Sequence, residues 1–338
     1  MVDIATYPSD FTLSVLHQMW KKNDITIPEW QREFVWSMQQ SSLLIESFLL
    51  GLPVPPVFFY IDEENKNLVV DGQQRILSVC FYFEGLFGDE TKQGKRQVFR
   101  LEGLDVRSPY HKKTFKELDE SGRRKLENAV LRALNIRQLG PEVDKENTSV
   151  YHIFERLNTG GTPLKPQEIR NCVFRGDIVK VLRNLNNDEN WRSILGKPVI
   201  DKHQKDVELI LRIFALSTDA KHYEKPMKEF LNKVMKRNRK ADSPVVKKFQ
   251  EDFVKITKFM VEMLGPKPFH IRGPLNAAVL DSVFCTLMIN SNEIPKNIGE
   301  RYTRLKADDI FTELTLISTS DTKIVTDRFL LAKKYLID

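Results

Sequence analysis

The chain has 338 residues, more than one average domain needs, and 41% of them are hydrophobic, including 21 phenylalanines that can fill a core. This composition excludes a disordered chain. The net charge is +6 and the sequence pI about 9.0, which favours an ordinary solvated surface and leaves a nucleic-acid or nucleotide partner as the alternative.

The cysteines and the hydropathy of the chain indicate the cellular compartment of the protein. The three cysteines, Cys80, Cys172 and Cys285, stand apart in apolar runs, which argues against a disulfide framework and a zinc site and predicts buried free thiols. The N-terminus is acidic and polar, so no signal peptide is expected. The most apolar stretch, residues 43–61, contains Glu46 and three prolines and is not expected to span a membrane. We therefore expect a cytoplasmic protein without a membrane partner.

The first 140 residues mix helical and strand periodicity. Helices are predicted at residues 10–20, 38–50, 73–87 and 111–128. Strands are predicted at residues 25–27, 56–61, 68–70 and 130–136, with a further hairpin at 97–104. Gly51 and Pro53 end the second helix, as a C-cap glycine and a following proline commonly do.

The pattern changes near Gly140. Helical periodicity then predominates, and no strand of comparable clarity follows. Helices are predicted at residues 148–157, 166–174, 177–186, 204–216, 226–236, 244–264, 275–290 and 322–337. The sequence therefore predicts an α+β protein, with a mixed α/β N-terminal domain over residues 1–140 and a helical C-terminal domain over residues 141–338.

The clearest chemical signal is the turn from a strand into a helix at residues 69–76. Such a turn presents backbone N–H groups and the positive end of the helix dipole, and Gly72 lets the backbone approach a ligand closely. Gln74 and Arg75 offer donors that match phosphate oxygens, and Asp71 could hold a metal ion or orient a water. The plainer interpretation is that Asp71 caps the helix, Gly72 makes the turn and Arg75 is solvated.

Two further clusters are weaker when taken alone. Residues 28–36 set Gln31 and Arg32 among aromatic residues, where Arg32 could contact a second phosphate or pair with a neighbouring glutamate. The aromatic residues fit a core or a lid. Gly160 and Gly161 form a loop between two helices, which could bring backbone N–H groups to a ligand or only connect the helices.

Four segments, taken in order, resemble the N-terminal domain of GmrSD-type restriction subunits, also described as Domain of Unknown Function 262. They are PEWQREFVW at 28–36, GLPVPP at 51–56, VVDGQQR at 69–75 and FERLNTGGTPL at 154–164. The resemblance covers residues 25–175 and implies a ParB/sulfiredoxin-like fold for the first domain.

The resemblance also implies roles for individual residues. ParB-like proteins carry a phosphate-binding turn where this chain has residues 71–75, and residues 148–175 of the helical domain would contribute to the same site. The resemblance carries phosphate contact onto Gly72, Gln73, Gln74 and Arg75 and makes Glu155 and Asn158 candidates for positioning a metal ion or a water. Together with the chemistry of the residues themselves, this makes Asp71, Gln74, Arg75 and Glu155 the candidate catalytic residues, with Asp71 also a candidate metal ligand. The candidate ligand-binding residues are Gln31, Arg32, Gly72, Gln73, Asn158, Gly160 and Gly161.

The leading hypothesis is a nucleotide-binding, NTP-hydrolysing protein related to DNA restriction and phage defence in bacteria, with a nucleoside triphosphate and Mg²⁺ as cofactors. The six histidines form no cluster, so a His-Asn-His nuclease within the chain is not supported, and a separately encoded nuclease or modification protein would be the partner. One alternative is a non-catalytic DNA-binding or partner-recruiting module, with the basic run at 235–240 as the first place to test for DNA-phosphate contact. Another is a metal-dependent nuclease that uses the ParB-like pocket.

Overall fold

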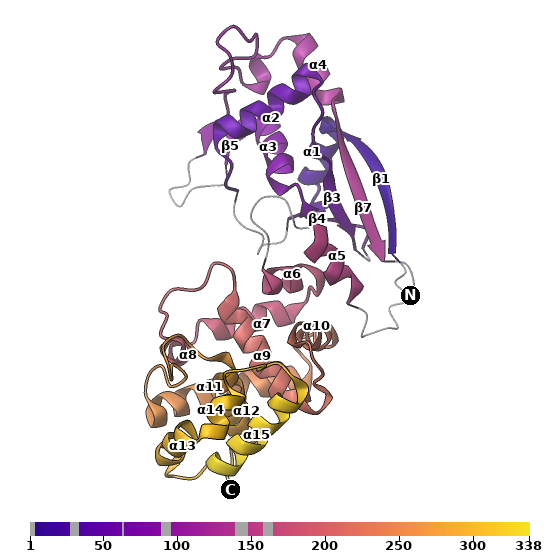
Figure 1. The fold of residues 1–338 in the computed structure, drawn as a ribbon. Coiled ribbons are helices and arrows are strands. Elements are labelled where there is room, and N and C mark those ends of the chain that lie inside the picture. Colours follow the sequence, from indigo (N-terminus) through magenta and orange to yellow (C-terminus); the bar gives the residue numbers. More distant parts are fainter. Residues whose placement is uncertain (1–3, 28–33, 63, 89–95, 139–147, 158–164) are drawn as a thin grey trace. The chain divides into compact units, whose positions relative to one another are not determined.

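The computed structural model describes residues 4–27, 34–62, 64–88, 96–138, 148–157 and 165–338 (Figure 1). The chain divides into two compact units, and neither is one continuous stretch. The first unit consists of Met1–Pro141 and Ile153–Pro163, and the second of Glu142–His152 and Leu164–Asp338. The helix α5 (Ser149–Leu157) contributes residues to both.

A five-stranded mixed sheet forms the centre of the first unit. Its strands are β1 (Ile4–Thr12), β2 (Ile25–Thr26), β3 (Val57–Ile61), β4 (Asn67–Asp71) and β7 (Val130–Gln138), in the order β1-β7-β3-β4-β2. The pairs β1–β7 and β3–β4 are antiparallel, and the pairs β7–β3 and β4–β2 are parallel. The strands β1 and β7, drawn in indigo and magenta, run side by side along their whole length (Figure 1).

The first unit's helices cover one face of this sheet. They are α1 (Leu13–Lys21), α2 (Met38–Leu50), α3 (Gln73–Glu84) and α4 (Glu120–Asn128), accompanied by the 3₁₀ turn η1 (Phe115–Glu117) and the short pair β5 (Leu86–Phe87) and β6 (Gln97–Val98). Alternate residues of β3, namely Val57, Phe59 and Ile61, are buried in one apolar core with residues of α1, α2 and α3. This alternation is the period-2 pattern of a strand with two different faces.

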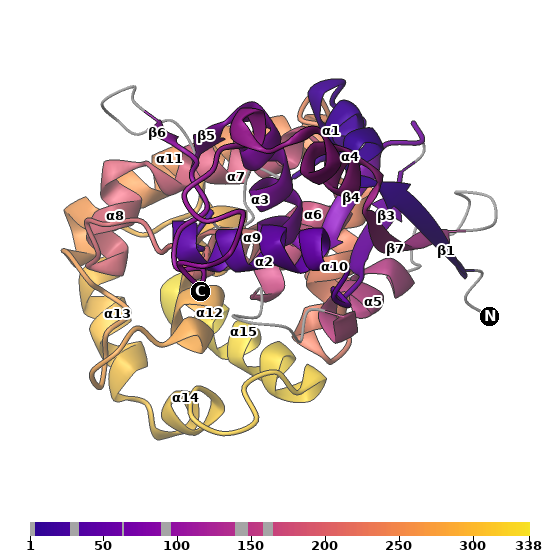
Figure 2. The same ribbon diagram turned by 90° about the horizontal axis from the view of Figure 1, so that it is seen from above.

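In the described residues of the second unit, all regular secondary structure is helical. Its helices are α6 (Pro166–Val173), α7 (Asp177–Asn186), α8 (Glu189–Leu195), α9 (Lys205–Asp219), α10 (Met227–Arg237), α11 (Pro244–Leu264), α12 (Ala277–Ile289), α13 (Ile298–Ala307), α14 (Asp309–Leu314) and α15 (Thr322–Leu336), with the 3₁₀ turn η2 (Ala220–His222). The helix α12 is apolar around nearly its whole circumference and packs against α9, α11 and α15 (Figures 1 and 2). A helix of that composition belongs in the interior.

The α+β class predicted from the sequence is confirmed, and several element bounds differ. The helix predicted from residue 10 begins at Leu13, because residues 4–12 form the edge strand β1 and Thr12 caps the helix with its hydroxyl. The helix predicted at 111–128 is only η1 and α4, and the hairpin predicted at 97–104 is only β6 paired with β5. The short helices α8, α13 and α14 were not predicted.

The three cysteines have the state that the sequence predicts, since Cys80, Cys172 and Cys285 are buried free thiols. None of the described helices combines the length and the apolar character that crossing a bilayer requires.

Candidate functional site

The predicted phosphate-binding turn joins β4 to α3. Asp71 is the last residue of β4, and Gly72 is the N-cap of α3 with φ +99°, in the left-handed region that favours glycine. A Cβ atom on Gly72 would lie 2.3 Å from Cγ1 of Val57 and 3.2 Å from its Cα atom. The backbone of the turn therefore lies directly against β3, and only glycine fits there without a shift.

An ion pair closes the turn. Arg75 donates from Nη2 to Oδ2 of Asp71 at 2.9 Å and to the carbonyl oxygen of Pro56 at 3.1 Å. The side chains of Asp71 and Arg75 are only 26% and 18% exposed. Arg75 is therefore not the solvated residue of the plainer interpretation, and its guanidinium group is held over the start of β3.

Among the described residues, no side chain caps α3, whereas α1, α2 and α4 each have a side-chain cap, from Thr12, Ser37 and Asp119. The plainer interpretation of the sequence predicted that Asp71 caps this helix, but the carboxylate of Asp71 pairs with Arg75 instead. The first N–H groups of an α-helix have no intrahelical acceptor. The start of a helix is the kind of position at which proteins bind anions.

Gln74 joins the turn to the segment before α2. Its Oε1 atom accepts hydrogen bonds from the backbone N–H groups of Val35 at 2.9 Å and Trp36 at 3.0 Å. Gln74 is buried, and its Nε2 atom has no partner among the described residues. The carbonyl end of this side chain thus positions residues 35–36, and the amide end is left as a buried donor.

The described end of the segment at 28–36, residues 34–36, packs against the core through Phe34 and Trp36. Phe34 packs edge-on against Phe81 at 5.0 Å and Phe87 at 5.5 Å between ring centroids. Gln31 and Arg32, the residues predicted to contact phosphate, lie outside the described residues.

The helix α5 reaches the sheet of the first unit through Phe154. Its ring packs against Tyr60 of β3, with centroids 5.9 Å apart and the rings at 64°. Glu155, the next residue, is partly buried. Asn158, Gly160 and Gly161 lie outside the described residues. The structure thus brings Asp71, Gly72, Gln73, Gln74 and Arg75 into one turn and places Glu155 on a helix that contacts the same sheet.

A buried polar network follows the glycine pair, in the second unit, and was not predicted from the sequence. Arg170 of α6 is 1% exposed and donates to Glu208 of α9 at 2.7 Å and to Asn232 of α10 at 2.8 Å. Asn171 donates to Gln204 at 2.6 Å. Buried charges and amides that satisfy one another hold α6 against α9 and α10, which is a structural role.

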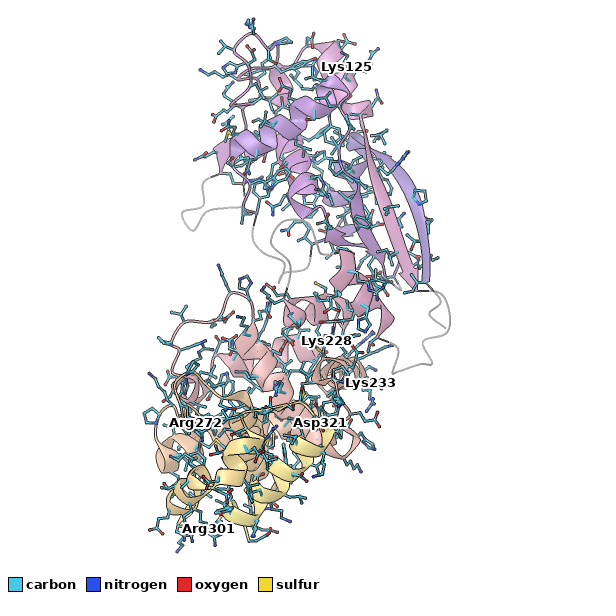
Figure 3. The ribbon with its side chains drawn as sticks, viewed as in Figure 1. Lys125, Lys228, Lys233, Arg272, Arg301 and Asp321 are labelled. Carbon is cyan, nitrogen blue, oxygen red and sulfur yellow. The ribbon has the colours of Figure 1, made fainter. Side chains whose placement is uncertain are left out.

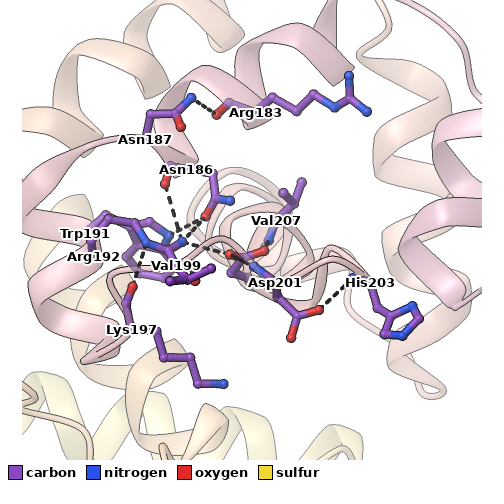
Figure 4. Close-up of polar contacts among 11 residues, drawn as sticks. Arg183, Asn186, Asn187, Trp191, Arg192, Lys197, Val199, Asp201, His203 and Val207 are labelled. Carbon is purple, nitrogen blue, oxygen red and sulfur yellow. Dashed lines mark hydrogen bonds and ion pairs between the residues drawn. The ribbon is translucent and has the colours of Figure 1, made fainter. Parts of the chain in front are cut away.

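A second buried pair lies at α8 (Figure 4). Arg192 donates to Asp206 at 2.7 Å and to Oδ1 of Asn186 at 2.9 Å, and to the carbonyl oxygens of Lys197 and Val199. Asp206 is 3% exposed. These bonds join α8 to the end of α7, to the loop after α8 and to the start of α9, so this cluster also stabilises the fold.

A metal site built by the protein alone is not found in the described part of the chain, where no three His, Cys, Asp or Glu residues come together. Asp71 offers one carboxylate, of which Oδ2 accepts from Arg75. One or two carboxylates are the usual protein contribution to Mg²⁺ that is bound together with substrate phosphates. The residues present fit that kind of metal binding.

The comparisons with known proteins bear on the same region. No curated protein matches the chain. The family model of the GmrSD restriction endonuclease, N-terminal domain, matches residues 14–175, a range that contains α2, the turn at Gly72, α5 and α6. Residues 14–175 of this chain therefore belong to the GmrSD restriction endonuclease N-terminal domain family. This membership indicates a protein related to DNA-restriction proteins.

Proposed function

We propose that this protein binds a nucleoside triphosphate at the turn between β4 and α3 and hydrolyses it, and that this hydrolysis is a step in DNA restriction. The observation that supports the proposal best is the geometry of the turn, in which Gly72 is the N-cap of α3 and the ion pair of Asp71 and Arg75 lies beside it. Helix starts of this kind bind phosphate in unrelated nucleotide-binding proteins.

Arg75 would contact the phosphates. It is preoriented by Asp71 and Pro56, and its Nε atom has no partner among the described residues. An arginine that is already fixed loses little side-chain entropy when it binds and can neutralise charge that develops on a transferred phosphoryl group.

Asp71 and Glu155 would serve the hydrolytic step. Asp71 holds Arg75 in place and offers its second oxygen to Mg²⁺ that arrives with the nucleotide. Bound Mg²⁺ would neutralise charge on the phosphate oxygens. Glu155 would orient the attacking water, which forms a bond to the terminal phosphorus while the bond to the nucleoside diphosphate breaks.

The remaining assignments stay proposals within this function. Gln31, Arg32, Gln73, Asn158, Gly160 and Gly161 would complete the nucleotide site, on a first unit with a ParB/sulfiredoxin-like fold. A separately encoded nuclease or modification protein would be the partner that acts on DNA.

A second candidate function, DNA binding without turnover, is favoured by the distribution of charge. The second unit carries 33 Lys and Arg residues against 26 Asp and Glu, a net charge of +7, whereas the first carries 19 against 20. A basic unit attracts the phosphate backbone of DNA. In the basic run at 235–240, Arg237 pairs with Asp219 at 2.9 Å, and the carbonyl oxygen of Arg239 accepts from Ile178, so this run also has a structural role.

The test is a binding and turnover panel on the full chain with ATP, GTP, CTP, UTP and their deoxy forms, with Mg²⁺, with and without DNA. Arg75→Ala is expected to lose nucleotide binding and turnover while it keeps its fold. Arg124→Ala is the matched control, because Arg124 also pairs with an acid one turn away, Glu120, on exposed α4.

Four outcomes separate the functions. Turnover that is lost in Arg75→Ala and kept in Arg124→Ala supports a nucleotide-driven enzyme. Unchanged affinity in Arg75→Ala contradicts the assignment of the site. Salt-dependent duplex binding without any nucleotide binding supports the DNA-binding module, and metal-dependent nicking that is lost in Asp71→Ala supports a nuclease.

A further inference from the structure

A cavity of about 370 Å³ opens in the second unit at the beginning of α12. The loop before α12, the end of α13, and α14 with the loop that follows it form its wall. Its polar lining consists of Arg272, Asn276, Lys306, Thr312, Thr315 and Thr319. Among the described residues that line it there is no aspartate or glutamate, so its fixed charges are all positive.

The two cations of this cavity have neutral neighbours. Arg272 donates from Nη2 to the hydroxyl oxygen of Thr312 at 2.6 Å, and Nζ of Lys306 lies 4.8 Å from the ring centre of Tyr302 (Arg272 is labelled in Figure 3). Within the described residues, neither forms an ion pair. Two cations at one cavity without a carboxylate raise the local positive potential, which favours an anion.

The wall is fixed by hydrogen bonds before any ligand arrives. Arg328 is fully buried and donates from Nη1 to the carbonyl oxygens of Leu314 at 3.2 Å and Thr319 at 3.1 Å, which holds the loop between them. Asn276 donates to the carbonyl oxygen of Thr315 at 3.0 Å. A preformed wall lowers the entropic cost of binding.

The N-terminus of α12 does not supply the positive potential of the cavity. The Oδ1 atom of Asn276 accepts from the backbone N–H groups of Ala278 at 2.9 Å and Val279 at 3.1 Å, so the helix is capped by its own chain. An anion in this cavity would therefore be held by the side chains of Arg272 and Lys306.

The rest of the lining is apolar and partly open to solvent. Leu275, Phe311 and Leu316 contribute to it, and Leu316 is 56% exposed. Ile317, the next residue, is 67% exposed. Large exposed apolar side chains beside two cations suit a ligand that has a flat apolar part and an anionic end.

We propose that this cavity is a second ligand site, which takes a nucleoside phosphate. The base would lie against Leu275 and Leu316, and the phosphate would lie between Arg272 and Lys306, with threonine hydroxyls as further donors. The volume is at the lower end of the range of small-molecule pockets, enough for one nucleotide and more than a phosphate ion needs. The site lies in the second unit and does not depend on the function proposed for the turn at Gly72.

The nucleoside phosphate could be a free nucleotide or one nucleotide of a DNA strand, and one experiment separates these sources. Full-length protein with ¹³C-labelled Ala and Leu methyl groups is titrated with thymidine 5′-monophosphate, with a ten-nucleotide oligothymidylate and with inorganic phosphate. The methyl signals of Leu275, Ala277 and Leu316 are expected to shift. Saturation by the oligonucleotide at a concentration at least about tenfold lower identifies DNA as the source, and equal affinity identifies the free nucleotide.

Charge-removing variants test the assignment of the anion contacts. The double variant Arg272→Gln and Lys306→Gln is expected to weaken binding by at least about tenfold, since it removes both cations. Lys306→Arg keeps the charge and the contact with Tyr302, and it should keep the affinity. Arg304→Gln is the matched control, because Arg304 is an exposed cation on α13 that does not line the cavity.

Any of three results would overturn the proposal. The methyl signals do not shift with either nucleotide probe, they shift equally with inorganic phosphate at the same concentration, or the folded double variant keeps its affinity. Arg75→Ala, which tests the turn in the first unit, should leave these methyl shifts as they are, so the two sites fail or succeed separately.

Discussion

Replacing Gly72 by alanine tests the geometry of the turn on which the proposed function rests. The backbone there has φ +99°, and the new Cβ atom would meet Cγ1 and Cβ of Val57 at 2.3 and 2.8 Å. A left-handed conformation costs an L-residue about 1–2 kcal/mol, and forcing a methyl group into a packed core costs about 1–3 kcal/mol more. Gly72→Ala should therefore lower the free energy of unfolding by about 2–5 kcal/mol.

Gly85→Ala separates the two contributions. Gly85 is the C-cap of the same helix with φ +80°, and nothing lies within 4 Å of the Cβ position. Its replacement should cost only the conformational part, about 1–2 kcal/mol. The difference between the two variants then measures the contact with Val57.

The assay is urea unfolding followed by tryptophan fluorescence, which reports chiefly on the first unit because Trp20, Trp30 and Trp36 belong to it and only Trp191 to the second. Equal losses of stability in Gly72→Ala and Gly85→Ala would refute the close approach of the turn to β3. Reduced nucleotide binding in Gly72→Ala at temperatures where it is folded would link the same contact to function.

Three further predictions concern other polar and buried groups. Gln74→Ala should leave the N–H groups of Val35 and Trp36 without acceptors and speed their hydrogen exchange, whereas Gln74→Glu keeps an acceptor and should keep the protection. Burial raises the pKa of Asp206, but hydrogen bonds from a backbone N–H group and from Arg192 outweigh it and hold the pKa below its ordinary value. The stability that Asp206 contributes should therefore be present above the unfolded-state pKa of about 3.9 and be lost as the pH falls through the lower folded-state pKa. Unfolding curves of wild type and Asp206→Asn from pH 7 down to pH 2 would show this loss. A wild type that loses no more stability than Asp206→Asn over this range would contradict the prediction. All three cysteines are buried, so a thiol reagent should modify none in the native protein and all three in denaturant, and rapid modification of the native protein would contradict that burial.

The elements that could be predicted from sequence are those whose burial follows a regular period. The strand β3 alternates buried and partly buried residues, and α2 ends at a glycine with φ +72°, so both stood out. The strand β1 was missed because it is an edge strand in which Thr6, Tyr7 and Pro8 are exposed, which removes the alternating pattern.

In the candidate site too, the features that depend on neighbouring residues in the sequence could be predicted, and those that depend on the tertiary structure could not. A strand, a glycine and a helix in succession indicate the turn at Gly72 without any knowledge of the fold. The partners of Arg75 and Gln74 could not be found that way, because the Pro56 carbonyl is 19 residues from Arg75 and the N–H groups of Val35 and Trp36 are 39 and 38 residues from Gln74. Only the tertiary structure brings those groups together.

The division of the chain has a consequence for how this protein can be cut or recombined. The backbone passes from one unit to the other three times, after Pro141, His152 and Pro163. A fragment that stops at Pro141 would lose Phe154 and leave the ring of Tyr60 without that neighbour. The two units therefore cannot be exchanged between proteins at a single crossover point. An exchange of the first unit would have to carry the eleven-residue stretch Ile153–Pro163 as well as Met1–Pro141.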